Sequence, residues 1–133
     1  MAAYHIDSDF LIYATSQSGP ERVRLLELSA SPARLHMSAL AWYEYVRGPR
    51  LPEEIALARH LLEEDDGIVP LTDELASRAA EVYRQLGSPR RRVNDIAIGV
   101  TAAAARVVLL TRNTRDFAGI EDLEVEGFAG GTS

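Results

Sequence analysis

Short apolar segments alternate along this chain with longer segments that carry apolar residues at helical spacing. The apolar segments are residues 4–6, 35–37, 68–71, 106–111 and 123–126, and a pair of helices is predicted in each of the first three intervals between them. Parallel strands need crossover connections of this length, because a tight turn can join only antiparallel strands. The pattern therefore predicts an α/β fold: a three-layer α/β/α domain with a mainly parallel central sheet.

The length and composition of the chain set its class. A chain of 133 residues suits one domain, which we place at residues 1–126, and the glycine-rich residues 127–133 are expected to form a flexible tail. No apolar run approaches the roughly 20 residues that a membrane-spanning helix needs. The chain has no cysteine, which excludes disulfides and thiolate metal sites and favours a cytoplasmic location.

The charge of the chain gives two opposing indications about nucleic acid. A net charge of −6 argues against a nucleic-acid partner, but all fourteen basic residues are arginine, the side chain best suited to forked contact with phosphate. Seven of the arginines fall in three groups, and ordinary solvated surface is the alternative interpretation of each group. The groups are Arg47 and Arg50; Arg90, Arg91 and Arg92; and Arg112 and Arg115.

Acidic and other polar residues gather just beyond the predicted strands. In open parallel sheets, ligands bind outside the carboxyl ends of the strands, so these side chains are candidates for a shared site. Glu44 is the least easily explained as surface, because it lies within the apolar segment "LAWYEYV", where an unpaired charge is unfavourable. The candidates are Asp7 and Asp9 after the first strand, Ser38 and Glu44 after the second, Thr111, Asn113 and Asp116 after the fourth, and Asp95 in the helix before it.

Each acid also has a local explanation. Asp7 or Asp9 could cap the first helix, Asn94 or Asp95 could cap the helix at residues 93–105, and Asp116 could belong to a turn. If instead the carboxylates converge, they repel one another unless protons or cations compensate. An oxygen-only cluster without cysteine or histidine suits Mg²⁺ or Mn²⁺, which could activate water beside a phosphodiester.

Four segments, in this order, resemble the PIN-domain ribonucleases, and specifically the VapC-type toxins of bacterial toxin–antitoxin pairs. They are "IDSDFLI", "SALAWYEYVRG", "NDIAIGVTAAA" and "LLTRNTRDF", and the last two carry the most specific part of the likeness. The resemblance makes Asp7, Glu44, Asp95 and Asp116 the four catalytic, metal-binding acids of a PIN-like nuclease domain.

The same resemblance implies function and partners. It implies an endoribonuclease that depends on Mg²⁺ or Mn²⁺, forms a homodimer, and is held inactive by a cognate antitoxin whose C-terminal segment fills the acidic cleft. Ser8, Thr111 and Asn113 would be supporting contacts, as would Asp9, which stands where the family often has asparagine. Gly99 replaces the more usual alanine, and we expect this change to matter little.

Three other classes of protein remain as alternatives. A strand followed by "DSD" also opens the haloacid-dehalogenase-like phosphatases, and receiver domains share an acidic pocket, but both normally need a lysine that this chain lacks. A non-catalytic PIN-like binding module is the third possibility. The presence of all four acids argues against it.

Overall fold

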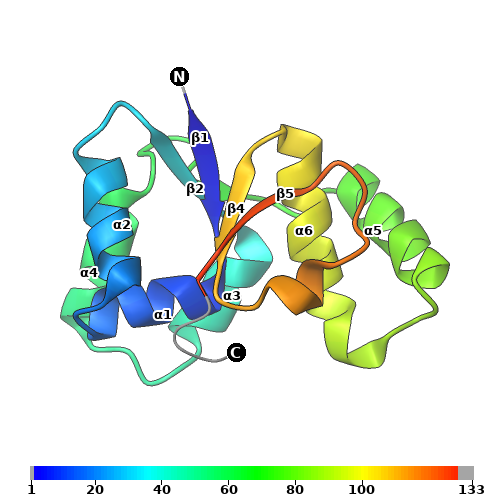
Figure 1. The fold of residues 1–133 in the computed structure, drawn as a ribbon, viewed down its shortest axis with the longest axis horizontal. Helices are drawn as coiled ribbons and strands as arrows, with labels where there is room; N and C mark the ends of the chain where they lie inside the picture. The colour runs from blue at the N-terminus through cyan, green and yellow to red at the C-terminus, as the bar shows by residue number, and fades with distance from the viewer. Residues whose placement is uncertain (1, 129–133) are drawn as a thin grey trace.

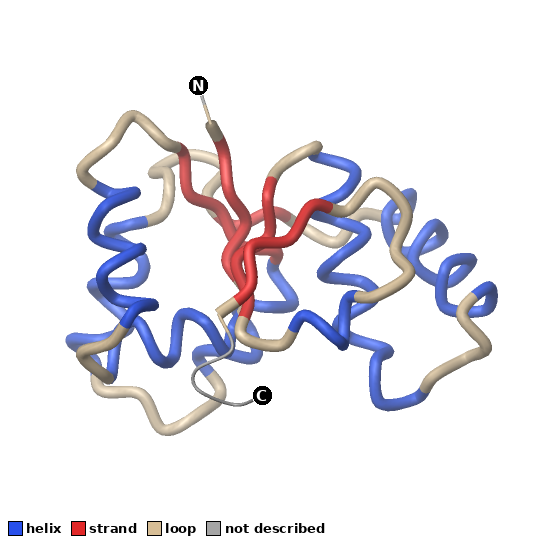
Figure 2. Tube along the Cα trace, viewed as in Figure 1, coloured by secondary structure: helices blue, strands red, loops and turns tan. Residues whose placement is uncertain are grey.

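The computed structural model describes residues 2–128, and its five strands form one sheet. The strands are β1 (Ala3–Ile6), β2 (Arg34–Ser38), β3 (Ile68–Val69), β4 (Val108–Thr111) and β5 (Glu124–Gly127). Their order in the sheet is β3-β2-β1-β4-β5, and every neighbouring pair is parallel. Figure 2 shows the strands in the centre of the molecule with helices on either side.

The helices complete the predicted three-layer arrangement. On one side of the sheet lie α1 (Ser8–Ser16), α2 (Pro20–Ser29) and α4 (Pro52–Leu61), and on the other lie α5 (Asp73–Gln85) and α6 (Val93–Ala105) (Figure 1). Helix α3 (Ala39–Val46) follows β2 directly and packs against both α1 and α6. The prediction of an α/β/α domain with a parallel sheet is confirmed.

Two short 3₁₀ helices lie between the longer elements. They are η1 (Arg90–Arg92), which leads directly into α6, and η2 (Thr114–Phe117), which follows β4. Both pack against α6. Their positions matter for the site, because one precedes Asp95 and the other contains Asp116.

The core is built on the central strands. Strand β1 has neighbours on both edges, with Tyr4 paired to Leu35 of β2 and to Val108 of β4. Ile6, Leu35 and Leu109 are each at most 1% exposed, as expected for parallel strands that helices cover on both faces. The apolar residues thus fix the strands in register, so that Ile6 lies beside Leu110 and both strands end at the same edge.

The end of the described chain differs from the sequence-based boundary. Gly127 is the last residue of β5, and the Phe128 amide donates a hydrogen bond to the Thr111 carbonyl at 2.8 Å. The Phe128 ring packs edge-on against Phe10, with ring centroids 5.0 Å apart. These two residues therefore belong to the domain and not to a flexible tail. The rest of the expected tail, residues 129–133, lies outside the described residues.

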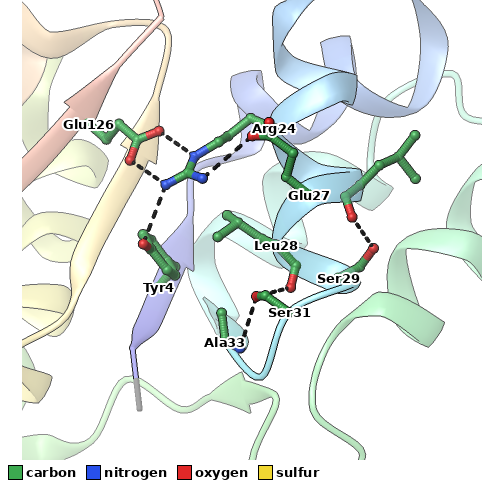
Figure 3. A network of polar contacts seen from close by, with 9 residues as sticks. Tyr4, Arg24, Glu27, Leu28, Ser29, Ser31, Ala33 and Glu126 are labelled. Atoms are coloured by element: carbon green, nitrogen blue, oxygen red, sulfur yellow. Dashed lines mark hydrogen bonds and ion pairs between the residues drawn. The ribbon is translucent and has the colours of Figure 1, made fainter.

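A group of polar contacts fastens α2 to the edge strand β5 (Figure 3). Arg24 donates to both carboxylate oxygens of Glu126, at 2.7 and 3.0 Å, and it lies 3.4 Å from the hydroxyl of Tyr4 on β1. Glu27 adds a longer ion pair at 3.6 Å. A bidentate pair of this kind fixes both partners, and here it joins segments about one hundred residues apart.

Within residues 2–128, no helix has the length and apolar character to cross a membrane.

Candidate active site

Asp7 lies at the carboxyl end of β1 and serves two roles at once. It is the N-cap of α1, and its Oδ1 accepts a hydrogen bond from the Ser8 amide at 3.0 Å. Its Oδ2 accepts a second bond from the Thr111 hydroxyl at 2.8 Å. The side chain is buried, at 4% exposed. The capping interpretation is therefore correct, but it does not exclude the site interpretation, because the same carboxylate faces the other acids.

Glu44 reaches the site from α3. Ser38 begins this helix by accepting a hydrogen bond from the Ala41 amide at 3.1 Å. Each oxygen of Glu44 then accepts one bond: Oε1 from the Ser8 hydroxyl at 3.2 Å, and Oε2 from the side-chain amide of Asn94 at 3.4 Å. The charge inside the apolar segment is thus explained, since Glu44 is held by donors from two other helices.

Asp95 comes from the first turn of α6, but it does not cap that helix, whose N-cap is Arg92. One carboxylate oxygen each of Asp7, Glu44 and Asp95 lie within 4.8 Å of one another. Three acids from three different elements therefore share one space at the carboxyl end of the sheet. This is the arrangement that the positions of the polar residues led us to expect.

Asp116 lies beside this group and not within it. It belongs to η2, it accepts a hydrogen bond from the side-chain amide of Asn113, and its oxygens are not among those within 4.8 Å of one another. Its charge nevertheless acts on Asp95. The sequence-predicted set of four is thus a close triad with a fourth acid at its edge.

Gly99 explains how η2 can lie so near to Asp95. A Cβ at this position of α6 would lie 2.6 Å from Cδ1 of Ile120 and 3.1 Å from Cδ1 of Phe117, the last residue of η2. Glycine therefore lets this segment approach the helix closely. The expectation that alanine and glycine are equivalent here does not fit this geometry.

The electrostatics of the triad reflect burial first and the closeness of like charges second. Burial raises the pKa of Asp7 well above its ordinary range, and Asp9 and the charge of Asp95 raise it further, against the opposing hydrogen bond from Thr111. Burial also raises the pKa of Asp95 to about 7, with further contributions from the charges of Asp116, Glu44 and Asp9; Arg92 lowers it. Raised carboxyl pKa values of this kind are typical of buried acids that face other carboxylates, as in many functional sites.

The remaining predicted residues support the triad from the start of α1, the end of β4 and the loop after β4. Asp9 accepts a hydrogen bond from the Arg112 amide at 3.3 Å, and the Thr111 hydroxyl accepts one from the Asn113 amide at 3.0 Å. Ser8, Asp9, Thr111 and Asn113 therefore form a polar layer around the acids. Asn94, which the sequence suggested only as a helix cap, is the additional site contact, and nothing in its local sequence indicated that it would meet Glu44.

The donor set of the triad fits a small divalent cation. Asp7, Glu44 and Asp95 offer only carboxylate oxygens, which are the ligands that Mg²⁺ and Mn²⁺ prefer. Their spacing allows one ion to contact all three. A cation would offset the mutual repulsion that adds to the effect of burial on the pKa values of Asp7 and Asp95.

Comparisons with known proteins identify a family and a fold. A model of the PIN domain family matches residues 4–123. No curated protein matches the chain. Among solved structures, a toxin–antitoxin complex from Klebsiella pneumoniae is similar at 27% identity, with 92% of this chain and 95% of that chain covered and a TM-score of 0.66.

Two further structures share the fold at lower identity. One is VapBC2 from Rickettsia felis bound to a DNA fragment from its promoter, at 19% identity, 95% and 98% coverage and a TM-score of 0.71. The other is VapBC-1 from nontypeable Haemophilus influenzae, at 23% identity, 94% and 97% coverage and a TM-score of 0.67. The coverage shows that this chain has the length and the fold of one whole chain in these complexes.

Proposed function

The chain belongs to the PIN domain family, and on this premise we propose that it is a VapC-type toxin that cuts RNA with the help of Mg²⁺ or Mn²⁺. The observation that carries the proposal is the convergence of Asp7, Glu44 and Asp95 within 4.8 Å. Three carboxylates from separate elements are unfavourable for stability unless a cation offsets their repulsion. Proteins keep such an arrangement where it serves chemistry.

The proposed metal ligands are Asp7, Glu44 and Asp95, with Asp116 as the fourth acid. When bound there, a divalent cation would supply an activated water and would stabilise charge on the scissile phosphate. The protein's own residues fix the ligands: Thr111 and the Ser8 amide hold Asp7, while Ser8 and Asn94 orient Glu44. Asp116, held by Asn113, contributes its charge at the edge of the site.

We propose a cognate antitoxin as the natural inhibitor and a homodimer as the assembly. The similarity to a toxin–antitoxin complex supports the first, and an acidic site of this kind would accept an arginine or lysine of a partner in place of the cation. The exposed side chains of Tyr43 and Val93, at 60% and 52%, are apolar surface that an assembly would cover. A toxin of this type would act in the cytoplasm.

The direct test is cleavage of a labelled single-stranded RNA by the purified protein, with and without Mg²⁺. We expect cleavage that needs the cation, stops in chelator, and falls at least a hundredfold in Asp7→Asn, because removal of a metal ligand weakens both binding and chemistry. Asp65→Asn is the matched control, since Asp65 is an exposed acid before β3. Equal cleavage by the Asp7→Asn variant and the parent would refute the assigned role. Faster cleavage of DNA of the same sequence would refute the choice of RNA.

A further inference from the structure

The structure divides the three predicted arginine groups into two kinds of residue. Arg50, Arg92 and Arg112 are used inside the domain: Arg50 donates to the Tyr45 carbonyl at 3.2 Å, and Arg92 to the Asp116 carbonyl at 3.0 Å. Arg112 pairs with Glu21 at 3.1 Å. These three guanidinium groups hold loops and helices in place.

The other four arginines of these groups are exposed and do not hold loops or helices of the domain in place. They make no side-chain hydrogen bond or ion pair with any residue in the range 2–128, although Arg47 lies 6.0 Å from the ring of Tyr43. We call them the rim arginines: Arg47, Arg90, Arg91 and Arg115.

Each rim arginine is close in sequence to an acid of the site. Arg47 lies one helical turn beyond Glu44, Arg90 and Arg91 lie in η1 just before the α6 turn that holds Asp95, and Arg115 adjoins Asp116.

Printed contacts tie these elements together in space. The Asn94–Glu44 hydrogen bond joins α6 to α3, and the Arg92–Asp116 hydrogen bond joins η1 to η2. The elements that carry the rim arginines therefore meet at the end of the sheet where the triad lies. Arg78 and Arg106, by contrast, line a cavity of about 1070 Å³ at the opposite end of α6.

We propose that the rim arginines bind the phosphates of the RNA on either side of the bond to be cut; this rests on the proposed function. The rim arginines lie on three separate elements, so a single ligand can contact them all only if it is extended and carries several negative charges. A nucleic-acid strand meets both conditions, because its phosphates repeat along its length. This arrangement also explains how a chain with a net charge of −6 could hold RNA: its positive charge is local. An acidic peptide is less favoured, since only the phosphate backbone would also place a bond at the carboxylates.

The test measures binding apart from cleavage. A labelled single-stranded RNA of mixed sequence is titrated by fluorescence anisotropy with Asp7→Asn protein at several salt concentrations from 50 to 200 mM. In this background, R90Q/R91Q should weaken binding about tenfold at the lowest salt and reduce the slope of log affinity against log salt by about 1.4, since each lost phosphate contact on a single strand accounts for about 0.7. R115Q alone should reduce the slope by about half as much.

The matched control is R78Q/R106Q, which changes the net charge by the same amount at the far end of α6. It should leave affinity within about twofold. Equal losses of RNA affinity in R90Q/R91Q and R78Q/R106Q, or no loss of RNA affinity in either, would overturn the proposal. So would a loss of binding to poly-glutamate without a loss of binding to RNA, because that result would assign the rim to a protein partner. If the parent protein does not cleave RNA but the rim variants lose binding as described, the nuclease proposal fails, and only RNA binding by the rim arginines stands.

Discussion

The side-chain amide of Asn94 lies 3.4 Å from Oε2 of Glu44, although the two residues are 50 positions apart in the chain. Together with Ser8, Asn94 gives each oxygen of this carboxylate one donor. Residues that orient a metal ligand through such bonds typically contribute 10- to 100-fold to metal affinity.

We therefore expect Asn94→Ala to weaken Mn²⁺ binding about tenfold, measured by the electron paramagnetic resonance signal of free Mn²⁺. The comparison variant is Asn113→Ala, which removes a contact to Asp116 instead of one to the triad. Asn113→Ala should weaken Mn²⁺ binding less than Asn94→Ala does. Unchanged Mn²⁺ affinity in Asn94→Ala would show that Glu44 needs no such orientation.

Asp95 makes the metal-free protein less stable as the pH rises. Its pKa in the folded protein is raised to about 7 from an ordinary value of 3.8, so the folded state retains a proton that the unfolded chain has lost. The stability that this proton provides is complete below about pH 3.8 and disappears as the pH passes through 7.

Asp95→Asn should therefore stabilise the metal-free protein at pH 8 by about 1–2 kcal/mol, allowing for solvent screening of a half-buried group, and have little effect at pH 4. The variant should also lose most of the rise in melting temperature that Mg²⁺ or Mn²⁺ gives the parent. Urea unfolding in chelator at the two pH values and melting with added metal measure these effects. A gain in stability that is the same at both pH values would contradict this account.

Gly99→Ala should lower the free energy of unfolding by about 1 kcal/mol, even though alanine favours helix. Alanine gains about 1 kcal/mol in helix propensity over glycine. The new methyl group would overpack against Ile120 and Phe117, and we expect this overpacking to cost more than the gain. Ile120→Val removes the nearest atom, Cδ1, so it should be less damaging in the Gly99→Ala background than in the parent. A higher melting temperature for Gly99→Ala alone would show that η2 yields without strain.

Glu21 and Arg112 form the most buried ion pair within residues 2–128, with side chains 4% and 15% exposed. Glu21→Gln would leave the guanidinium of Arg112, which lies 3.4 Å from the ring centroid of Tyr13, without its charge partner. We expect a loss of about 2–3 kcal/mol in the free energy of unfolding, measured in urea. Glu27→Gln, on the same helix but in an exposed pair with Arg24, should change it by less than about 0.5 kcal/mol. If Glu21→Gln and Glu27→Gln lowered the free energy of unfolding equally, burial would not strengthen the Glu21–Arg112 ion pair.

The order of the elements followed from local sequence patterns. The strand at residues 4–6 and the helix at residues 93–105 lie where the spacing of apolar residues predicted them. The weakest predicted strand, at residues 123–126, is displaced by one residue and extends the sheet into what had been assigned to a tail. A hydrogen bond from Phe128 to Thr111 decides that boundary, and no local pattern reports it.

The sequence by itself determined the fold class and indicated that Asp7, Glu44 and Asp95 would gather at one edge of the sheet, because a parallel sheet brings the ends of its strands together whatever the details of packing. Only the tertiary structure decided that Asp116 stands outside the triad and that Asn94 contacts it. It also decided that Arg112 pairs with Glu21, whereas the Arg115 side chain has no such partner among residues 2–128. The physical reason is distance along the chain. Periodicity and capping act over a few residues, whereas the bonds that shape this site join residues 36, 50 and 104 positions apart, and those depend on how whole helices pack.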